Sequence, residues 1–293
     1  MKIAIVILNY NSAADCRKCI ADLKRQTGID AEIVVVDNCS REDDRRAAEQ
    51  LCRENGCTFI ASAENRGYNA GNNIGLRHAA EKGYEFAMIC NPDMEFPQAD
   101  YIDKLLAPML RDENIAVCGS DIRTPEGVHQ NPRSYSRGSW LHSFRWVKDI
   151  FRKKDKGSVP DWVADPHVSR HCRGLNGCCL LLRISFVRQI GYFEERIFLY
   201  GEEPVLARQA EMAGKSMFYT AEASAIHNHR KSKEGGSAFC SGHWRHSQLV
   251  AVRYYSGYPF YGKWFAMLSV VTYFLTLNLY HRFRGYGNPQ DTL

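Results

Sequence analysis

Short apolar runs alternate with amphipathic stretches over the first 120 residues. The runs predicted to be strands are Ile3–Leu8, Glu32–Asp37, Thr58–Ala61, Phe86–Cys90 and Ile115–Gly119. The stretches predicted to be helices are Ala14–Arg25, Asp43–Glu54, Gly71–Lys82 and Tyr101–Arg111. Continuous apolar runs such as residues 33–36 are typical of strands that helices cover on both faces. The alternation therefore predicts an α/β fold with a doubly wound, mostly parallel sheet.

The second half of the chain has a less regular pattern. Residues 121–176 are rich in Arg, Pro, Ser and aromatic residues, which predicts a long irregular segment that passes over the ligand-binding edge of the sheet. Regular structure is predicted to return as a strand at Gly177–Arg183, a helix at Glu203–Gly214 and a strand at Lys215–Tyr219, followed by a histidine-rich loop and an amphipathic helix near Ser241–Tyr255. We therefore expect one α/β domain over 1–235, with halves 1–120 and 121–235, and a C-terminal helical extension over 236–293.

The extension ends in an uncharged apolar stretch. Trp264–Tyr280 holds 17 residues without a formal charge, flanked by Lys263 and by Arg282 and Arg284. This is just under the ~20 residues that span a bilayer. Its aromatic residues and basic flanks favour a helix that lies in a membrane surface. A helix packed on the α/β domain, or on a second copy in a homodimer, is the alternative.

Composition narrows the class of protein. The chain has 293 residues, 45% of them hydrophobic, which excludes a disordered chain and a disulfide-stapled mini-protein. Its 11 cysteines are scattered and odd in number, and Met1–Leu8 reads as a first strand without the cleavage site of a signal peptide. We therefore expect free thiols in a reducing cytoplasm.

The net charge of +5 is concentrated in two segments. Residues 131–173 carry ten Lys/Arg against four Asp, and residues 227–263 carry six Lys/Arg against one Glu. Such a basic face suits phosphate groups or lipid head groups, although a solvated basic surface is the plainer interpretation. No nucleic-acid partner is expected, because no nucleic-acid-binding motif accompanies the charge.

Polar side chains follow each of the first four predicted strands. They are Asn9 and Asn11 after the first, Asp37 at the end of the second, Asn65 and Arg66 (followed by Gly67) after the third, and Asn91 and Asp93 after the fourth. The carboxyl ends of parallel strands meet at one edge of a sheet, where ligands of such sheets bind. We therefore expect these residues to form one polar rim.

Asp93 is a candidate metal ligand. It comes directly after a buried strand, where a Mg²⁺ or Mn²⁺ ion that bridges two phosphates would sit. His227 and His229 offer further ligands, and Arg230 and Lys231 offer positive charge for a diphosphate. An Asp that caps a turn after Pro92, and an ordinary surface loop at 227–231, are the alternatives.

Two other segments suit a nucleotide. Asp37 could accept hydrogen bonds from a ribose hydroxyl or a base, or merely cap the next helix. Glycines at 67, 71 and 75, with Asn72 among them, allow close backbone approach near a helix start that offers N–H groups to phosphate. This spacing is not the G-x-G-x-x-G fingerprint, which disfavours a nicotinamide cofactor.

Glu202 and Glu203 are candidates for a general base. They stand side by side just before a predicted helix, at the end that the helix dipole favours for negative charge. The alternative is ordinary N-terminal helix charge.

The order and spacing of these motifs resemble the family 2 inverting glycosyltransferases of the GT-A fold, over roughly residues 3–232. The motifs are residues 7–11, 36–40, 65–73, 90–93, 177–183, 191–195 and 198–203, and the His/Ser segment at 227–232. Within the family the likeness is greatest to the rhamnosyltransferase-like branch. The resemblance implies that 1–120 is the nucleotide-binding half and 121–235 the acceptor and catalytic half.

The resemblance also implies residue roles. Asp93 takes the place of the retained carboxylate of the metal site, and Asn91 replaces its first Asp. Asp37 and Arg66 would hold the nucleoside end of the donor. Glu203 takes the place of the catalytic Asp, with Glu202 as the second choice for the base.

The implied reaction moves a sugar from a nucleotide-sugar donor to a hydroxyl of a bacterial surface polysaccharide or lipid-linked glycan, at the cytoplasmic face of the inner membrane. The donor expected first is dTDP-L-rhamnose, followed by UDP-hexoses and UDP-galactofuranose. A non-catalytic polysaccharide-binding member of the fold is one alternative. A sugar nucleotidyltransferase is another, although residues 9–12 lack its glycine-rich phosphate loop.

Overall fold

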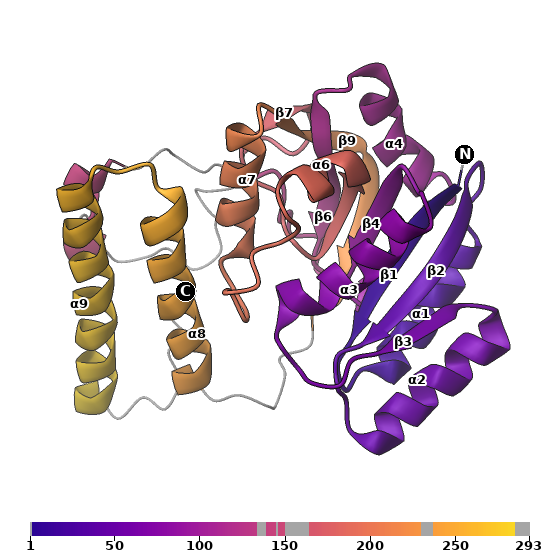
Figure 1. Cartoon of the computed structure of the whole chain (residues 1–293), viewed down its shortest axis with the longest axis horizontal. Helices are drawn as coiled ribbons and strands as arrows, with labels where there is room; N and C mark the ends of the chain where they lie inside the picture. Colours follow the sequence, from indigo (N-terminus) through magenta and orange to yellow (C-terminus); the bar gives the residue numbers. More distant parts are fainter. Residues whose placement is uncertain (1, 134–138, 145, 150–163, 230–236, 285–293) are drawn as a thin grey trace.

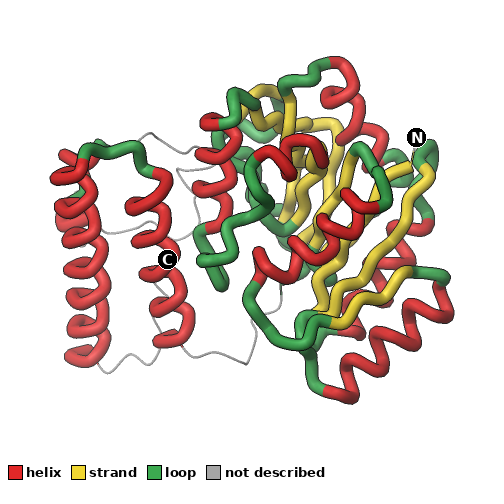
Figure 2. The backbone as a smooth tube through the Cα atoms, in the orientation of Figure 1, coloured by secondary structure: helices red, strands yellow, loops and turns green. Residues whose placement is uncertain are grey.

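The computed structural model describes residues 2–133, 139–144, 146–149, 164–229 and 237–284. Its centre is one mixed sheet with the strand order β3-β2-β1-β4-β8-β6-β9-β5, and β7 pairs with β9 (Figures 1 and 2). The first four strands along this order are parallel. They are β1 (Lys2–Asn9), β2 (Asp30–Asp37), β3 (Thr58–Ala61) and β4 (Phe86–Cys90). The predicted doubly wound, mostly parallel sheet is confirmed.

Helices connect these strands, as the pattern predicted. They are α1 (Ala13–Lys24), α2 (Glu42–Asn55) and α3 (Tyr68–Glu81). Ile3, Ile5 and Ile7 of β1 face one buried cluster, and the intervening Ala4, Val6 and Leu8 face another. Because β1 is covered on both faces, its sequence is continuously apolar rather than alternating.

The second half adds antiparallel strands. It contains β5 (Met94–Glu95), α4 (Tyr101–Arg111), β6 (Ile115–Arg123), β7 (Arg170–Cys172), β8 (Cys179–Arg183), α6 (Ile184–Gln189), α7 (Glu202–Met212) and β9 (Ser216–His227). The strand β8 runs antiparallel to both β4 and β6, whereas β9 runs parallel to β6. The amino end of β8 therefore meets the carboxyl end of β4.

Several predicted boundaries need correction. The strand predicted at Ile115–Gly119 continues as β6 to Arg123, and the strand predicted at Gly177–Arg183 begins as β8 at Cys179. The strand predicted at Lys215–Tyr219 continues as β9 to His227, so His227 ends a strand and is not in a loop. The helix predicted from Gly71 begins three residues earlier, at Tyr68. Pairing with β6 explains the longer strand, because it resumes at Asp121↔Ser224 after an irregularity.

The C-terminal helices stand beside the sheet domain. They are α8 (Ser237–Val250), a π-helical segment η2 (Ala251–Tyr255) and α9 (Phe260–Arg284), and α8 and α9 lie side by side (Figure 1). Val250 packs with Ile197 and Val205 in a small apolar cluster that joins α8 to the domain. The short η1 (Trp140–His142) and α5 (Trp146–Asp149) pack against α9.

Candidate active site

A group of one carboxylate and two imidazoles lies past the ends of β4 and β9. Asp93 follows β4, and its carbonyl accepts a hydrogen bond from the backbone N–H of Asn228 at 3.0 Å. His227 and His229 flank Asn228, so both reach the Asp93 carboxylate: His227 Nε2 lies 3.4 Å from Oδ1, and His229 Nδ1 lies 3.7 Å from Oδ2. The antiparallel pairing of β5 with β9 sets this register, because Met94 faces His227.

The donor atoms of this group fit a divalent cation. One ligand atom from each of the three residues lies within 4.8 Å of the others. Asp93 Oδ1 and His227 Nε2 are buried and make no hydrogen bond among the described residues. Buried polar atoms without a partner are costly, so a ligand that they share would stabilise them. Carboxylate oxygen and imidazole nitrogen are suitable ligands for Mn²⁺ and, less so, Mg²⁺.

Neighbouring charges favour the ionised Asp93. Burial opposes its ionisation, but the two histidines outweigh burial and hold the pKa of the carboxyl well below its usual range. In return, Asp93 raises the pKa of His229. Gln130 Oε1 lies 3.3 Å from His227 Nδ1. With a cation bound, a hydrogen bond from Nδ1 to Gln130 would leave the Nε2 lone pair to the ion, in place of a proton shared with Asp93.

Two further carboxylates lie at the start of α7. Glu202 and Glu203 are its first residues, after Gly201. Arg133 Nη1 donates a hydrogen bond to Glu203 Oε1 at 3.0 Å. Glu202 is half-buried, and its buried Oε2 makes no hydrogen bond among the described residues. Burial and the charge of Glu203 raise the pKa of Glu202 to about 8, so Glu202 is mostly protonated at neutral pH.

Tyr68 joins the two groups of carboxylates. Its hydroxyl lies 3.0 Å from Asn91 Oδ1, two residues before Asp93, and 2.9 Å from the carbonyl of Gly177. A β-carbon at Gly177 would lie 3.4 Å from Glu203 Cγ and 3.6 Å from Glu202 Oε1. The end of β4 and the start of α7 are therefore neighbours in one site.

The residues predicted to hold the nucleoside lie on the same edge, where they also bind one another. The buried Asp37 accepts hydrogen bonds from Asn9 Nδ2 at 2.9 Å and from the N–H of Ser40 at 3.1 Å. Asn11 Oδ1 accepts a hydrogen bond from the N–H of Arg41. Both Asp37 oxygens thus contribute to shaping the loops after β1 and β2, and a role in donor binding stays a prediction.

The segment before α3 is fixed by its own contacts. Asn65 Oδ1 accepts hydrogen bonds from Asn38 Nδ2 and from the N–H of Gly67. Gly67 has φ of +96°, and a β-carbon there would lie 2.3 Å from the carbonyl oxygen of Phe198, so this position requires glycine. Asn72 donates to the carbonyl of Tyr68, and its buried Oδ1 has no hydrogen-bond partner among the described residues.

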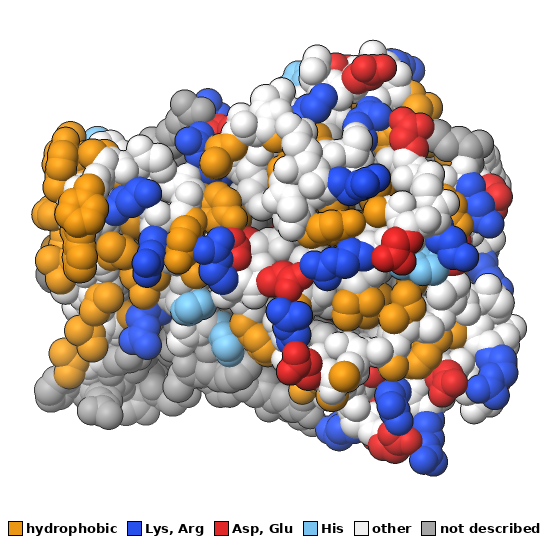
Figure 3. All heavy atoms as spheres, in the orientation of Figure 1, with side chains coloured by type: hydrophobic (Ala, Val, Ile, Leu, Met, Phe, Trp, Pro, Cys, Tyr) orange, Lys and Arg blue, Asp and Glu red, His pale blue; other side chains and the backbone are white. Residues whose placement is uncertain are grey.

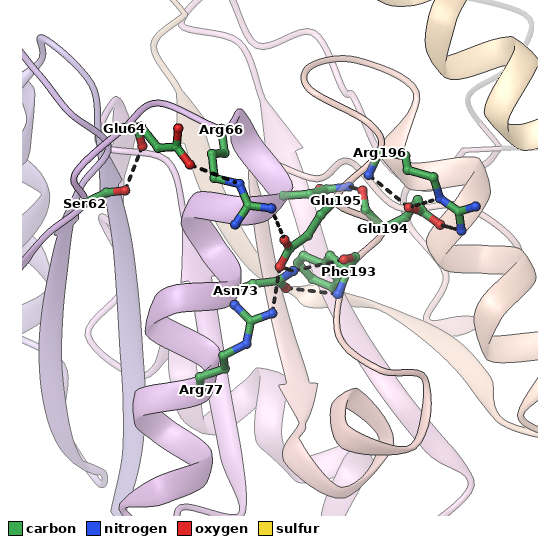
Figure 4. A network of polar contacts seen from close by, with 10 residues as sticks. Ser62, Glu64, Arg66, Asn73, Arg77, Phe193, Glu194, Glu195 and Arg196 are labelled. Atoms are coloured by element: carbon green, nitrogen blue, oxygen red, sulfur yellow. Dashed lines mark hydrogen bonds and ion pairs between the residues drawn. The ribbon is translucent and has the colours of Figure 1, made fainter.

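Arg66 points toward the loop before α7. Its guanidinium lies 3.0 Å from Glu195, which also binds Arg77 and Asn73 (Figure 4). More than half of its side chain is exposed, so a ligand could compete for it. Arg230 and Lys231, the cations predicted for the diphosphate, lie outside the described residues.

Sequence reasoning did not single out four residues of this site: Tyr68, Gln130, Arg133 and Gly177. Gln130 and Arg133 lie in residues 121–176, where the pattern of strands and helices is irregular. No periodicity there indicated which side chains point into the site. Tyr68 lies within the motif at 65–73 and was passed over for its polar neighbours. An aromatic residue next to a required glycine was the available signal.

Comparisons with known proteins bear on the family of this chain. Residues 4–174 match the model of the family described as glycosyl transferase family 2. The low-salt glycan biosynthesis hexosyltransferase Agl10 of Haloferax volcanii is 28% identical over 227 residues, covering 77% of this chain and 67% of that protein. The N-acetylglucosaminyl-diphospho-decaprenol L-rhamnosyltransferase of Mycobacterium tuberculosis is 24% identical over 261 residues, with 82% and 80% covered.

Solved structures show the same fold. GalNAc-T7, solved with UDP, GalNAc and Mn²⁺, superposes with a TM-score of 0.60 at 14% identity. The match covers 98% of this chain, which spans 59% of the length of that protein. The mannosyltransferase PcManGT of Pyrobaculum calidifontis, solved with GDP-Man and Mn²⁺, gives a TM-score of 0.59 at 17% identity, with 93% and 69% covered. The GT-A fold, the family model and the relatives together make this chain a member of glycosyl transferase family 2.

Proposed function

We propose that this glycosyltransferase moves L-rhamnose from dTDP-L-rhamnose, with inversion, to a hydroxyl of a lipid-linked glycan at the cytoplasmic face of a bacterial inner membrane. One observation carries the proposal: the Tyr68 hydroxyl contacts Asn91, two residues before Asp93, and Gly177, which adjoins Glu202 and Glu203. The segment that carries the residues proposed for the diphosphate thus adjoins the residues proposed for the base. Residues 1–235 would form the catalytic domain and 236–293 an accessory extension.

The names of two relatives favour rhamnose and a glycan acceptor. One is the mycobacterial rhamnosyltransferase described above, and another is the O-antigen chain rhamnosyltransferase WbaN of Salmonella anatum, 21% identical over 231 residues. UDP-hexoses and UDP-galactofuranose are the next donors to test. The choice rests on the sugar subsite, where one hydroxyl can decide specificity.

A divalent cation, Mn²⁺ or Mg²⁺, is proposed at Asp93, His227 and His229. When bound, it would neutralise charge on the diphosphate. Arg230 and Lys231 would add positive charge at the same phosphates. Asn9, Asn11, Asp37, Asn65, Arg66, Gly67, Asn72 and Asn91 are proposed to shape or contact the rest of the donor subsite.

Glu203 is the better candidate for the base. A base must be ionised, and at neutral pH the raised pKa keeps Glu202 mostly protonated. Glu203, by contrast, is paired with the Arg133 guanidinium. In the proposed reaction a Glu203 oxygen takes the proton of the acceptor hydroxyl. The oxygen of that hydroxyl forms a bond to the anomeric carbon as the bond from this carbon to the diphosphate breaks, and a single displacement inverts the configuration.

A ligand panel tests the donor and the metal together. Thermal unfolding is measured with dTDP-L-rhamnose, UDP-hexoses and UDP-galactofuranose, with and without Mn²⁺, followed by an assay of donor hydrolysis. We expect a rise in Tm with dTDP-L-rhamnose that requires Mn²⁺ and disappears in Asp93→Ala. The matched control is Asp30→Ala, an exposed aspartate at the amino end of β2, away from the site.

Each result has a separate meaning. A rise in Tm with a UDP-sugar alone would replace the donor and leave the site in place. A rise in Tm that does not require Mn²⁺ and is still seen in Asp93→Ala would refute the metal site. Stabilisation by no sugar nucleotide, while the protein unfolds cooperatively, would refute the donor site.

A further inference from the structure

The helix α9 carries an exposed apolar stripe. Its members are Phe260 (77% exposed), Trp264 (61%), Leu268 (56%), Leu275 (51%) and Leu279 (53%). They are separated by four, four, seven and four residues, which is the spacing of one helix face. Figure 3 shows hydrophobic side chains gathered over α9 at the left edge of the molecule, with Lys and Arg side chains beside them.

The other face of α9 is already packed on protein. Ala266, Ser269 and Phe274 are buried. The Ser269 hydroxyl accepts a hydrogen bond from Trp146 Nε1 at 2.9 Å and donates one to the carbonyl of Ser143 at 2.6 Å. Trp140 packs edge-on against Phe265. A helix held along one face by its own domain is placed to lie on a surface rather than to cross a bilayer.

The helix also meets the length and composition of a membrane segment. Among the described residues, the window Phe260–Leu277 is the one that combines 18 helical residues with a mean hydropathy of 1.2, and 22% of it is buried. A helix with one apolar face and one protein-bound face matches interfacial binding better than spanning. This length gives the stripe a long line of contact with a flat surface.

The positive charge around the stripe favours an anionic surface as its partner. Residues 235–290 contain five Lys/Arg and no Asp or Glu. Among them, Arg245 and Arg253 are exposed. Lys263 Nζ donates a hydrogen bond to the backbone carbonyl of Arg253, which ties the Lys263 side chain to the segment that carries Arg253. Anionic head groups attract such a segment. A second copy docked through the same face would instead oppose cation to cation, because a two-fold interface pairs each patch with itself.

We infer that the exposed stripe of α9, with its neighbouring cations, is a docking surface for an anionic lipid bilayer. The biological purpose of this surface rests on the proposed function, since a lipid-linked acceptor would be reached there. The binding itself does not depend on that function. Phe260, Trp264 and Leu268 would enter the boundary between head groups and acyl chains, while Arg253 and Lys263 remain at the phosphates.

Vesicle co-sedimentation of the full chain tests this inference. The vesicles are made of phosphatidylcholine alone, or of equal parts phosphatidylcholine and phosphatidylglycerol. We expect binding to the mixed vesicles that weakens with added salt, and little binding to phosphatidylcholine. The double variant Trp264→Ser/Leu268→Ser should bind the mixed vesicles about tenfold more weakly or worse, because each side chain loses most of its burial in lipid.

A matched double variant controls for lost surface apolarity. Leu110→Ser/Met212→Ser removes side chains of 56% and 63% exposure on α4 and α7, and should bind vesicles as the unchanged protein does. Circular dichroism and donor hydrolysis in solution should be alike for both double variants. If neither the unchanged protein nor the two double variants hydrolyse the donor, that result would count against the proposed function and not against the docking surface.

Three results would overturn the inference. The first is no binding to the mixed vesicles. The second is equal binding by the stripe and control variants. The third, from light scattering without lipid, is a dimer that Trp264→Ser/Leu268→Ser breaks, which would assign the stripe to a second copy.

Discussion

Two carboxylates at the same edge of the sheet have opposite acid–base behaviour. Asp93 has a pKa well below its usual range, and Glu202 has a pKa raised to about 8. Both are half-buried, and burial raises the pKa of each. The difference lies in the neighbours, since Asp93 faces two imidazoles and Glu202 faces the carboxylate of Glu203. Burial alone therefore does not decide which carboxylate can hold a cation and which stays protonated.

The two groups also differ in the chemistry that they can support. An ionised carboxylate beside two imidazoles offers a set of metal ligands. A protonated Glu202 beside an ion-paired Glu203 supports the proposal that Glu203 is the base. Four substitutions test this division, from the largest expected effect to the smallest.

Glu203→Gln should lower kcat about 10³-fold, because the amide cannot accept the proton of the acceptor hydroxyl. Donor affinity should stay near that of the unchanged protein. The measurement is steady-state transfer together with donor binding by calorimetry. Its matched control is Glu202→Gln, which changes the adjacent residue in the same way. Equal losses in both variants would remove the assignment of Glu203 as the sole base.

Asp93→Asn should lower turnover about 10²-fold and abolish Mn²⁺ binding near neutral pH, because it removes the single carboxylate of the metal group. Calorimetric titration with Mn²⁺ measures the second effect directly. Asp30→Asn, at the far end of β2, should titrate like the unchanged protein. Retained Mn²⁺ affinity in Asp93→Asn would place the ion elsewhere.

Gln130→Ala should weaken Mn²⁺ binding roughly tenfold. It removes the partner of His227 Nδ1. The loss of such a partner of a metal ligand typically lowers metal affinity about 10- to 100-fold. Calorimetry again provides the readout. The control is Gln50→Ala, on the exposed face of α2. Within the described residues, the Gln50 side chain hydrogen-bonds to Glu54. An unchanged affinity in Gln130→Ala would mean that His227 keeps its orientation without Gln130.

Glu202→Gln should change turnover at pH 7 by a few-fold at most, because glutamine resembles the protonated acid. Its larger effect is on stability. Between pH 4.5 and about 8 the unfolded state has released the Glu202 proton and the folded state has not, so the free energy of unfolding falls as pH rises. Glu202→Gln removes this fall, a relative gain on the order of a few kcal/mol at pH 8 compared with pH 5.

Urea unfolding at pH 5, 7 and 8 measures this gain. Glu222→Gln, at an exposed position of β9, is the control and should follow the unchanged protein at each pH. A stability difference between Glu202→Gln and the unchanged protein that is constant with pH would show that Glu202 is ionised over the whole range.

Much of the first half was predictable because its information is local. The strands Thr58–Ala61 and Phe86–Cys90 and the helix Tyr101–Arg111 have the boundaries that the pattern predicted. Continuous apolar runs reveal strands buried on both faces, and the parallel order follows from the helices between them. The position of Asp93 after β4 follows from the same rule.

The second half was harder, since its strands pair over long distances. Nothing in Lys215–Tyr219 indicates that the strand continues to His227, because pairing with β6 and β5 extends it. Arg133 reaches Glu203 from 70 residues away in sequence. No local pattern encodes such a contact.

The sequence by itself determined the fold class, the family resemblance and the residue types at the carboxyl edge. Those features depend on periodicity and on motifs within a few residues of one another. Only the tertiary structure decided that two histidines face Asp93, that burial and the charge of Glu203 raise the pKa of Glu202, and that one stripe of α9 is left exposed. Each of these depends on which surfaces meet in space, and the electrostatic and hydrophobic energies that follow are set by those distances.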